Sequence, residues 1–558
     1  MTTETSVKTS PRSKRGEEVD VAIIGAGPAG AVAALHLARA GFSVAVLEQG
    51  DWPDYNAYAG ARPEWELVSQ KYWHPNPNVR DRQGDYPIDN SDTAVNPLMF
   101  AGVGGSATLY GAQWMHLLPS DFRVRSLDGV ADDWPYTYED LLPYQLRIEK
   151  EVGISGLAGD PAYPPRPAYP LPPTPIGSVG MRGIQGMNEL GWHWWPGSNA
   201  IPPEKYGNLN PCVRRGTCLT GCPEAAKSTT DRSHWPEAVK NGVNLMTNTR
   251  AKRIETDERG RATGVLYVDR NGRERVQKAK TVILCANGVG TPRLLLLSES
   301  GRAPGGLANS SGLVGKRLMM HPFASVLASF EDPLDSWRGP FGQQIYSLEF
   351  YETDASRGFL RGSKWNCMPS GGPLGVSGVV GSKVYVAEEG RFQDLWGDAL
   401  HQNVRKRFGH SLIWGIVCED LPEESNYVTL SSDLVDSDGI PAPKIVYKVS
   451  ENSRRLLEFN IDRCVESVRA AGAIEWLLSY PVRESGWHLL GTCVMGEKAE
   501  SSVVDQWGRC HDVPNLYIMD GSTFPTSGAV NPTATVMAVA LRNTERLIQE
   551  RRSQETPL

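Results

Sequence analysis

The sequence has no stretch of about 18 consecutive apolar residues, the length that a membrane-spanning helix needs. Residues 1–18 are polar and carry charges of both signs, without the apolar segment of a secretory signal. We therefore predict no membrane partner, a cytoplasmic location, and a flexible tail at residues 1–16.

Positive charge is not in excess. The 57 Lys and Arg residues are outnumbered by 64 Asp and Glu residues, which gives a formal net charge of −7. Nucleic acids and anionic membranes select basic surfaces, so this balance argues against both as partners. Composition leaves the oligomeric state open.

Cysteine is scarce as well, with nine residues in a chain of 558. An odd number of cysteines in a cytoplasmic protein predicts free thiols. Cys212, Cys218 and Cys222 resemble the ligand run of an iron–sulfur protein, but a four-thiolate cluster needs a fourth cysteine, and the next is Cys285. We predict no metal site. An electron-transfer protein built on these cysteines is the less favoured alternative.

Glycine and proline, by contrast, are frequent, and one group of glycines has a clear pattern. An apolar run at residues 19–24 leads directly into Gly25, Gly27 and Gly30, followed by an Ala-rich helical stretch at 28–40. In such a turn the first glycine permits the tight bend, the second lets a pyrophosphate approach the backbone, and the third permits close packing of helix and strand.

A second expected strand, residues 43–47, ends in Glu48, about twenty residues after the glycines. A carboxylate at this place accepts hydrogen bonds from ribose hydroxyls and disfavours the 2′-phosphate of NADP. These residues predict a dinucleotide site without deciding between NAD and FAD. A late strand at residues 515–519 that leads to Asp520 and Gly521 is compatible with a flavin.

The order of the expected elements predicts an α/β protein. A Rossmann-like dinucleotide-binding domain is assembled from discontinuous segments, and an α+β substrate-binding or cap domain built on an antiparallel sheet is inserted between them. We assign residues 17–130, 205–317 and 485–551 to the first domain, and residues 131–204 and 318–484 to the second.

Several motifs occur together along the chain in a fixed order. They are the glycine turn at 25–30, GVGGSAT at 102–108, GCP at 221–223, ANGVGTPRLL at 286–295, GKRLMMHP at 315–322, WHLLGT at 487–492, and DGS at 520–522 with NPT at 531–533. In this order the chain resembles the glucose–methanol–choline (GMC) oxidoreductase family. The cysteine run and the cap region are most similar to its branch of pyranose oxidases and bacterial glycoside 3-oxidases.

The resemblance implies FAD as the cofactor, and places further cofactor contacts at Gly104, Gly105, Ser106, Ala251, Asp520, Gly521, Pro532 and Thr533. It also implies that His488 is the catalytic base and that Asn531 is its partner. An alcohol donates hydride as its hydroxyl proton leaves, so a neutral imidazole beside the substrate oxygen suits this chemistry. We expect His321, which precedes Pro322, to be a structural turn residue.

The chain departs from the resemblance at one position. Many pyranose-oxidase-like proteins have a histidine that bonds covalently to the flavin where this chain has Leu109. Leucine has no nucleophilic atom, so we predict non-covalent FAD.

The segment 342–362 lies where related sugar oxidases carry a substrate loop, which implies substrate roles for Gln344, Tyr346, Glu349 and Arg361. A polar edge strand is an equally good interpretation of this segment. The reaction expected from the resemblance is oxidation of a secondary ring hydroxyl of a sugar or glycoside to a keto-sugar, with electrons passing to O₂ or another acceptor. The alternative is a non-sugar alcohol such as a polyol or sterol.

Overall fold

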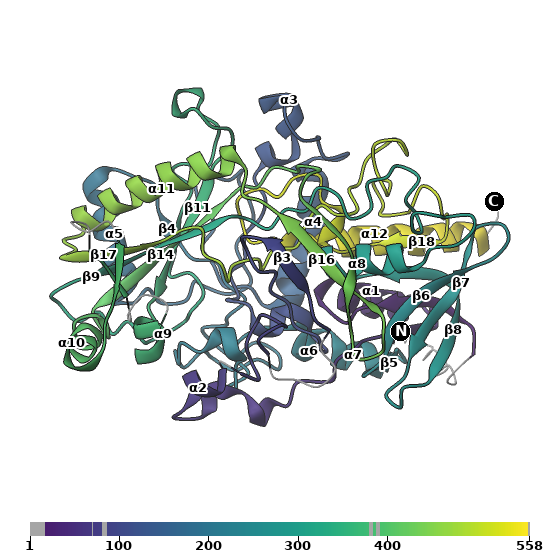
Figure 1. The fold of residues 1–558 in the computed structure, drawn as a ribbon, viewed down its shortest axis with the longest axis horizontal. Coiled ribbons are helices and arrows are strands. Elements are labelled where there is room, and N and C mark those ends of the chain that lie inside the picture. Colours follow the sequence, from purple (N-terminus) through teal and green to yellow (C-terminus); the bar gives the residue numbers. More distant parts are fainter. Residues whose placement is uncertain (1–16, 70, 81–85, 379–382, 387–390, 556–558) are drawn as a thin grey trace, which may run out of the picture.

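The computed structural model describes residues 17–69, 71–80, 86–378, 383–386 and 391–555. Two sheets lie at opposite ends of the molecule (Figure 1). One is largely parallel and the other is antiparallel, and together they confirm the predicted α/β fold class. The domain boundaries stay a prediction, and the proposed tail at 1–16 lies outside the described residues.

The seven-stranded sheet gathers segments that are far apart in the sequence. Its order is β5-β2-β1-β8-β7-β6, and β18 also pairs with β8. The pairs of β1 with β2, β2 with β5, and β8 with both β1 and β18 are parallel, whereas β6 and β7 join by antiparallel pairing. The strands are β1 (Val19–Ile24), β2 (Val44–Leu47), β5 (Asn244–Met246), β6 (Arg250–Thr256), β7 (Ala262–Val268), β8 (Glu274–Leu284) and β18 (Leu516–Ile518).

Parallel strands bring their carboxyl ends to one edge of the sheet, and the loops after β1, β8 and β18 therefore meet there. Strand β1 is mostly buried, as a strand covered by helices must be. Helices α1 (Pro28–Arg39) and α12 (Thr533–Glu555) pack against each other beside this sheet (Figure 1), and α8 (Asn287–Leu297) follows β8. This edge carries the glycine turn and the start of α8.

The six-stranded sheet is antiparallel throughout, in the order β17-β9-β14-β11-β10-β4. Its strands are β4 (Trp195–Pro196), β9 (Phe323–Ser329), β10 (Ile345–Ser347), β11 (Ser363–Pro369), β14 (Ser411–Cys418) and β17 (Glu475–Ser479). Helices α5 (Ser178–Leu190) and α11 (Glu451–Ala470) cover one face.

Side chains alternate along β11 as the pleat requires. Trp365 and Cys367 belong to the hydrophobic core shared with α5 and α11. Their neighbours Lys364, Asn366 and Met368 are directed to the opposite face, toward the parallel sheet. That second face lines a pocket.

The remaining elements complete the surface. A three-stranded sheet joins β3 (Asp89–Thr93), β15 (Tyr427–Val435) and β16 (Pro441–Tyr447), and β12 (Lys383–Val386) pairs with β13 (Arg391–Asp394). The other α-helices are α2 (Trp65–Ser69), α3 (Val124–Asp128), α4 (Tyr138–Val152), α6 (Thr230–Ser233), α7 (Trp235–Lys240), α9 (Pro373–Gly378) and α10 (Gly397–Arg407). Short 3₁₀ helices occupy Tyr55–Ala57, Ala59–Ala61, Gly105–Leu109, Pro119–Phe122, Cys218–Thr220, Ala355–Arg357 and Gly521–Thr523.

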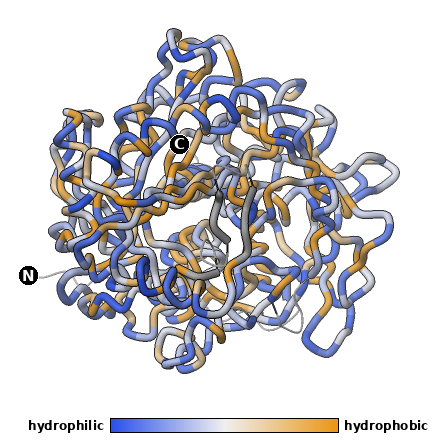
Figure 2. Tube along the Cα trace, turned by 60° about the vertical axis from the view of Figure 1, so that its left-hand side comes forward, coloured by the Kyte–Doolittle hydropathy of each residue, from blue (hydrophilic) through white to orange (hydrophobic). Residues whose placement is uncertain are grey.

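Hydrophobic segments run through the interior, and hydrophilic segments form the outer loops (Figure 2). Within the described ranges, no helix has both the length and the apolar character needed to cross a membrane. The cytoplasmic location stays a prediction.

Candidate active site

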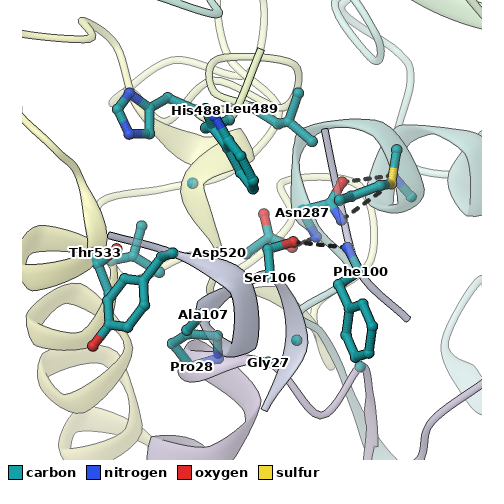
Figure 3. Close-up of a pocket in the computed structure, with 18 of the residues that line it drawn as sticks. Gly27, Pro28, Phe100, Ser106, Ala107, Asn287, His488, Leu489, Asp520 and Thr533 are labelled. Atoms are coloured by element: carbon teal, nitrogen blue, oxygen red, sulfur yellow. Dashed lines mark hydrogen bonds between the residues drawn. The ribbon is translucent and has the colours of Figure 1, made fainter. Parts of the chain in front are cut away.

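A cavity of about 450 Å³ lies between the carboxyl edge of the parallel sheet and the open face of the antiparallel sheet. Figure 3 shows Gly27 and Pro28 at one end of this pocket, His488 at the other, and Asp520 between them. Most of the predicted cofactor and catalytic residues line it: Gly25, Gly27, Glu48, Gly105, Ser106, Ala251, His488, Asp520, Gly521, Asn531, Pro532 and Thr533.

The glycine turn is built so that only glycine fits at two of its positions. Gly25 has a φ of +101°, and a Cβ there would lie 2.3 Å from the carbonyl oxygen of Cys285. A Cβ on Gly30 would lie 2.1 Å from the carbonyl oxygen of Gly25. Gly30 does not line the pocket but allows α1 to approach β1, which is the packing role predicted for it. Gly27 is the N-cap of α1, and no described side chain caps this helix end.

A second group of glycines, Gly104 and Gly105, packs against the glycine turn. Gly104 donates its backbone N–H to the carbonyl of Ala26 (2.9 Å) from a φ of +100°, and lies behind the pocket wall. Gly105 lies so close to Gly27 that a Cβ on it would be 2.7 Å from the Gly27 Cα. Ser106 faces the pocket, and its Oγ accepts the backbone N–H of Phe100 (3.2 Å).

Two buried acids organise the loops at this edge. Glu48 accepts backbone N–H groups of Ala26 (2.8 Å) and Gly50 (2.9 Å), so the carboxylate ties β2 to the glycine turn. Asp520 accepts the N–H of Asn287 (3.0 Å) and the hydroxyl of Thr291 (2.6 Å), both from α8. Burial raises the pKa of Asp520.

These features fit a dinucleotide. The glycine backbone at the N-terminus of α1 suits a pyrophosphate, since the helix dipole favours negative charge there. Glu48, Ala251 and the neighbouring Thr249 line the same end of the cavity, where a ribose and an adenine would be held. Pro532 and Thr533 line the wall at the start of α12.

The predicted catalytic pair is brought together although its members are 43 positions apart. Nε2 of His488 lies 3.4 Å from Nδ2 of Asn531. His488 lies in the loop after β17, and Asn531 lies two residues before α12. Both face the cavity.

The expectation that His321 is a structural turn residue is incomplete. His321 does have a turn-like φ of +54°, but its Nδ1 lies 2.7 Å from Nδ1 of His488. Its Nε2 lies 2.6 Å from the carbonyl oxygen of Gly528 and 3.2 Å from that of Ser527. His321 therefore lines the same pocket as the predicted base and is its direct neighbour.

We assign the protons of the two rings from these contacts. Nε2 of His321 faces carbonyl oxygens, which only accept, so this atom carries the proton of the neutral ring. Nδ1 of His321 is then an acceptor, and Nδ1 of His488 must donate to it. The remaining nitrogen of His488, Nε2, is left with a lone pair directed at Asn531, ready to accept a proton.

Both imidazoles are held in the neutral form. Burial lowers the pKa of His321 to about 4. Burial, together with the neighbouring His321 and Lys364, lowers the pKa of His488 well below its ordinary value. A base that is already neutral at pH 7 needs no prior loss of a proton.

The wall opposite the glycine turn is formed by the antiparallel sheet. Phe323 from β9, Asn366 and Met368 from β11, and Val417 from β14 line the pocket. Asn366 is buried, and among the described residues neither its amide nitrogen nor its amide oxygen has a hydrogen-bond partner. A pocket with one unpaired amide on an otherwise apolar wall suits a ligand with a hydroxyl group there.

The structure does not bring the four predicted substrate residues to this pocket, so they receive no substrate role. Gln344 is buried, and its Oε1 accepts the N–H groups of Gly177 (3.0 Å) and Gly180 (2.9 Å) at the start of α5. Tyr346 is buried and donates its hydroxyl to Asp160.

The other two residues of this group also have internal partners. Glu349 accepts the backbone N–H of His193 (2.7 Å). Arg361 is 1% exposed and donates to Asp121 (2.6 Å) and Glu419 (2.9 Å). A polar loop looks the same in sequence whether its groups face a ligand or other parts of the protein, and here they face other parts of the protein.

All nine cysteines are free thiols. Cys212, Cys218 and Cys222 line a second, much smaller cavity of about 20 Å³. In the part of the chain that the structure describes, no group of three or more His, Cys, Asp or Glu residues is placed to hold a metal ion. Leu109 is fully buried beside Tyr58 and Trp73.

Comparisons with known proteins give a consistent picture. Two family models described as GMC oxidoreductase match residues 184–323 and 422–540, and one described as FAD dependent oxidoreductase matches residues 20–64. The chain is 41% identical to a 2-methyl-1,2-propanediol dehydrogenase from Mycolicibacterium austroafricanum, over 94% of each chain. It is 29% identical to a fructose dehydrogenase large subunit from Gluconobacter japonicus, over 95% of this chain and 98% of that one. A formate oxidase structure from Aspergillus oryzae covers 97% of this chain with a TM-score of 0.64 at 16% identity.

Proposed function

Because this chain belongs to the GMC oxidoreductase family and is an FAD-dependent enzyme that acts on CH–OH groups, we propose that it oxidises a small polyol, with His488 as the base and Asn531 as its partner. The family and the cofactor are those predicted from the motifs. The roles of the individual residues and the choice of substrate are our proposal.

The proposed mechanism depends on the lone pair on Nε2 of His488. This atom accepts the hydroxyl proton of the substrate, while Nδ1 keeps its own proton in the contact with His321. Nδ2 of Asn531 donates a hydrogen bond to the same substrate oxygen and stabilises the negative charge that develops there. FAD, when bound, supplies the acceptor for the hydride that leaves the carbon. The alcohol then becomes a carbonyl compound.

The cofactor would be held by groups already described. The backbone at Gly25 and Gly27 would receive the pyrophosphate, and Glu48 would face a ribose. Gly105, Ser106 and Thr533 lie along the same cavity. We propose that FAD is bound without a covalent link, because Leu109 has no atom that can form one.

The wall formed by the antiparallel sheet supports a polyol over a sugar ring. Phe323, Met368 and Val417 are apolar, and Asn366 offers a single amide. A pyranoside has a hydroxyl on almost every carbon, and each one that is buried needs a polar partner. The relative at 41% identity is named for a diol with two hydroxyls, which supports the same ranking.

Sugar oxidation, the first expectation from the sequence, is the second candidate. The relative named as a fructose dehydrogenase large subunit aligns over almost the whole chain and supports it. We place it second because the relative named for a diol is more similar to this chain, at 41% identity against 29%.

The test is reduction of the bound flavin by a panel of alcohols under anaerobic conditions, which does not depend on the natural electron acceptor. The panel contains 1,2-diols, glycerol, simple mono-alcohols, free sugars and methyl glycosides. We expect 1,2-diols to bleach the flavin fastest. Faster bleaching by a sugar or glycoside than by every diol would reverse the ranking, and bleaching by none would refute alcohol oxidation in this pocket.

A further inference from the structure

Lys364 is a buried lysine directly behind the proposed catalytic pair. It lies on β11 and is 0% exposed. Its Nζ donates to three side-chain amide oxygens, those of Gln113 (2.7 Å), Gln343 (2.9 Å) and Asn531 (2.7 Å). All three partners are neutral, so this site is unlike an ordinary salt bridge.

The three oxygens match an ammonium group. An ammonium has three N–H donors, one for each oxygen, whereas a neutral amine has two hydrogens and would turn its lone pair toward the third oxygen. Burial alone lowers the pKa of Lys364 well below its ordinary value, and the three amide oxygens oppose that effect by solvating the charge. The contacts therefore favour the charged form.

Lys364 fixes which way the Asn531 amide points. Lysine only donates, so Asn531 must present Oδ1 to it. Nδ2 is then left on the side of His488, at 3.4 Å from Nε2. The reversed amide would place an NH₂ group against the ammonium and an oxygen against the lone pair of His488. Both contacts would be repulsive.

We propose that Lys364 is a positioning residue for the alcohol oxidation: it orients Asn531 as a donor to the substrate oxygen. This inference rests on the roles proposed for His488 and Asn531. It adds a residue from the antiparallel sheet to a site whose base comes from the loop after β17 and whose partner comes from the segment just before α12.

The surroundings of Lys364 are themselves held in place. Gln343 donates its amide to the carbonyl of Ser198 (3.1 Å), and its backbone N–H donates to Asn199 (3.0 Å). The contacts of Gln343 with Ser198 and Asn199 therefore help to fix the position of the Lys364 ammonium. The titratable groups that act on His488 are Lys364 and His321, and each lowers the pKa of His488.

A double-mutant cycle on the rate of anaerobic flavin reduction tests the proposal, with Lys364→Met, Asn531→Ala and the double variant. Loss of a hydrogen bond to a charged group costs about 10- to 100-fold, so we expect Lys364→Met to slow reduction by that factor. In the Asn531→Ala background the same substitution should cost no more than about threefold, because the group that Lys364 orients is already absent.

The pH profile is the second readout. Removal of the cation raises the pKa of His488, so the acid limb of the profile should move to higher pH in Lys364→Met and in the double variant. Lys227→Met is the matched control. Lys227 is equally buried and donates to three backbone carbonyls, including those of Thr108 (2.8 Å) and Tyr110 (3.1 Å). Its loss should leave the acid limb in place and act additively with Asn531→Ala.

Additive effects of Lys364→Met and Asn531→Ala, with an unmoved acid limb, would overturn the proposal. If Lys364→Met does not retain FAD, Lys364→Arg is the deciding variant. It keeps the charge, so we expect the acid limb to stay in place while flavin reduction slows non-additively with Asn531→Ala. Additive effects of Lys364→Arg and Asn531→Ala would overturn the proposal. A wild-type flavin that no alcohol reduces, or His488→Ala with a wild-type rate, would instead refute the proposed function.

Discussion

The two Nδ1 atoms of His321 and His488 lie 2.7 Å apart, with the imidazole planes at 83° to each other. Since both rings are neutral and Nε2 of His321 must donate to the carbonyl of Gly528, the hydrogen bond runs from His488 to His321. A catalytic imidazole has two neutral tautomers, and this contact selects the one with a basic Nε2.

Replacement of His321 tests this tautomer control. His321→Phe should slow anaerobic flavin reduction by about 10- to 100-fold, because His488 loses the acceptor for its Nδ1 proton and its preference between tautomers. His321→Gln is the matched variant, since its amide can accept from His488 with Oε1 and donate to Gly528 with Nε2. We expect the glutamine variant to reduce flavin clearly faster than the phenylalanine variant. Equal rates would show that His321 acts only through packing.

His488→Ala should slow flavin reduction by roughly 10²–10⁴-fold while FAD content is retained, because the cofactor contacts lie elsewhere in the pocket. Asn531→Ala should cost less, since the proton acceptor remains. The pKa of His488 lies well below its ordinary value, so the wild-type rate should be constant around neutral pH and fall only as acid protonates Nε2. Stopped-flow reduction across pH measures both. A rate that begins to fall already above pH 7 would contradict the depressed pKa.

The cofactor end of the site is predictable from sequence because its signals are local. Gly25 lies in the turn after β1, Gly30 lies in α1, and Glu48 directly follows β2, so their spacing in the sequence predicts the local backbone geometry that the structure has. His488 and Asn531 required the resemblance to a known family, since neither has a local pattern of its own.

The residues that were missed depend on contacts over long separations. His321 and His488 are 167 positions apart, and so are Lys364 and Asn531. The alternation of side chains along a strand predicts that Lys364 and Asn366 lie on the same face of β11. It does not predict which domain that face contacts. For Arg361 the sequence suggested a substrate contact where the structure has an internal ion pair. Its partner Asp121 is 240 positions away, and nothing near Arg361 in the sequence indicates this pair.

Acid precipitation should release all of the flavin into the supernatant. Leu109, the position where the sequence resemblance leads us to expect a linking histidine in pyranose-oxidase-like proteins, is buried in a hydrophobic cluster with Phe100. A flavin spectrum measured on the washed pellet and on the supernatant decides the point. Colour that stays with the pellet would mean that another residue forms a covalent bond.

Arg361→Met should destabilise the fold by about 3–5 kcal/mol, because it leaves Asp121 and Glu419 buried without their cation. Chemical denaturation measures this change. The apparent KM for the best substrate should stay within about threefold of wild type in the protein that remains folded, because Arg361 does not line the pocket. A large rise in KM at unchanged stability would restore the substrate role that the sequence suggested.

Asn366 should determine the preference for a substrate with a second hydroxyl. Its amide is buried on the pocket wall, and among the described residues it has no hydrogen-bond partner. A buried amide without a partner costs free energy. A substrate hydroxyl that pairs with this amide recovers that cost, and a mono-alcohol of the same size does not.

Asn366→Leu separates these effects, because leucine has a similar volume and no polar atom. We expect the ratio of kcat/KM for a 1,2-diol to that for the matching mono-alcohol to fall by about tenfold, which corresponds to one lost hydrogen bond of ~1.4 kcal/mol. The same substitution should raise the unfolding midpoint of the substrate-free protein, since it removes a buried unpaired amide. An unchanged ratio together with a lowered midpoint would show that Asn366 is a structural residue with no part in substrate recognition.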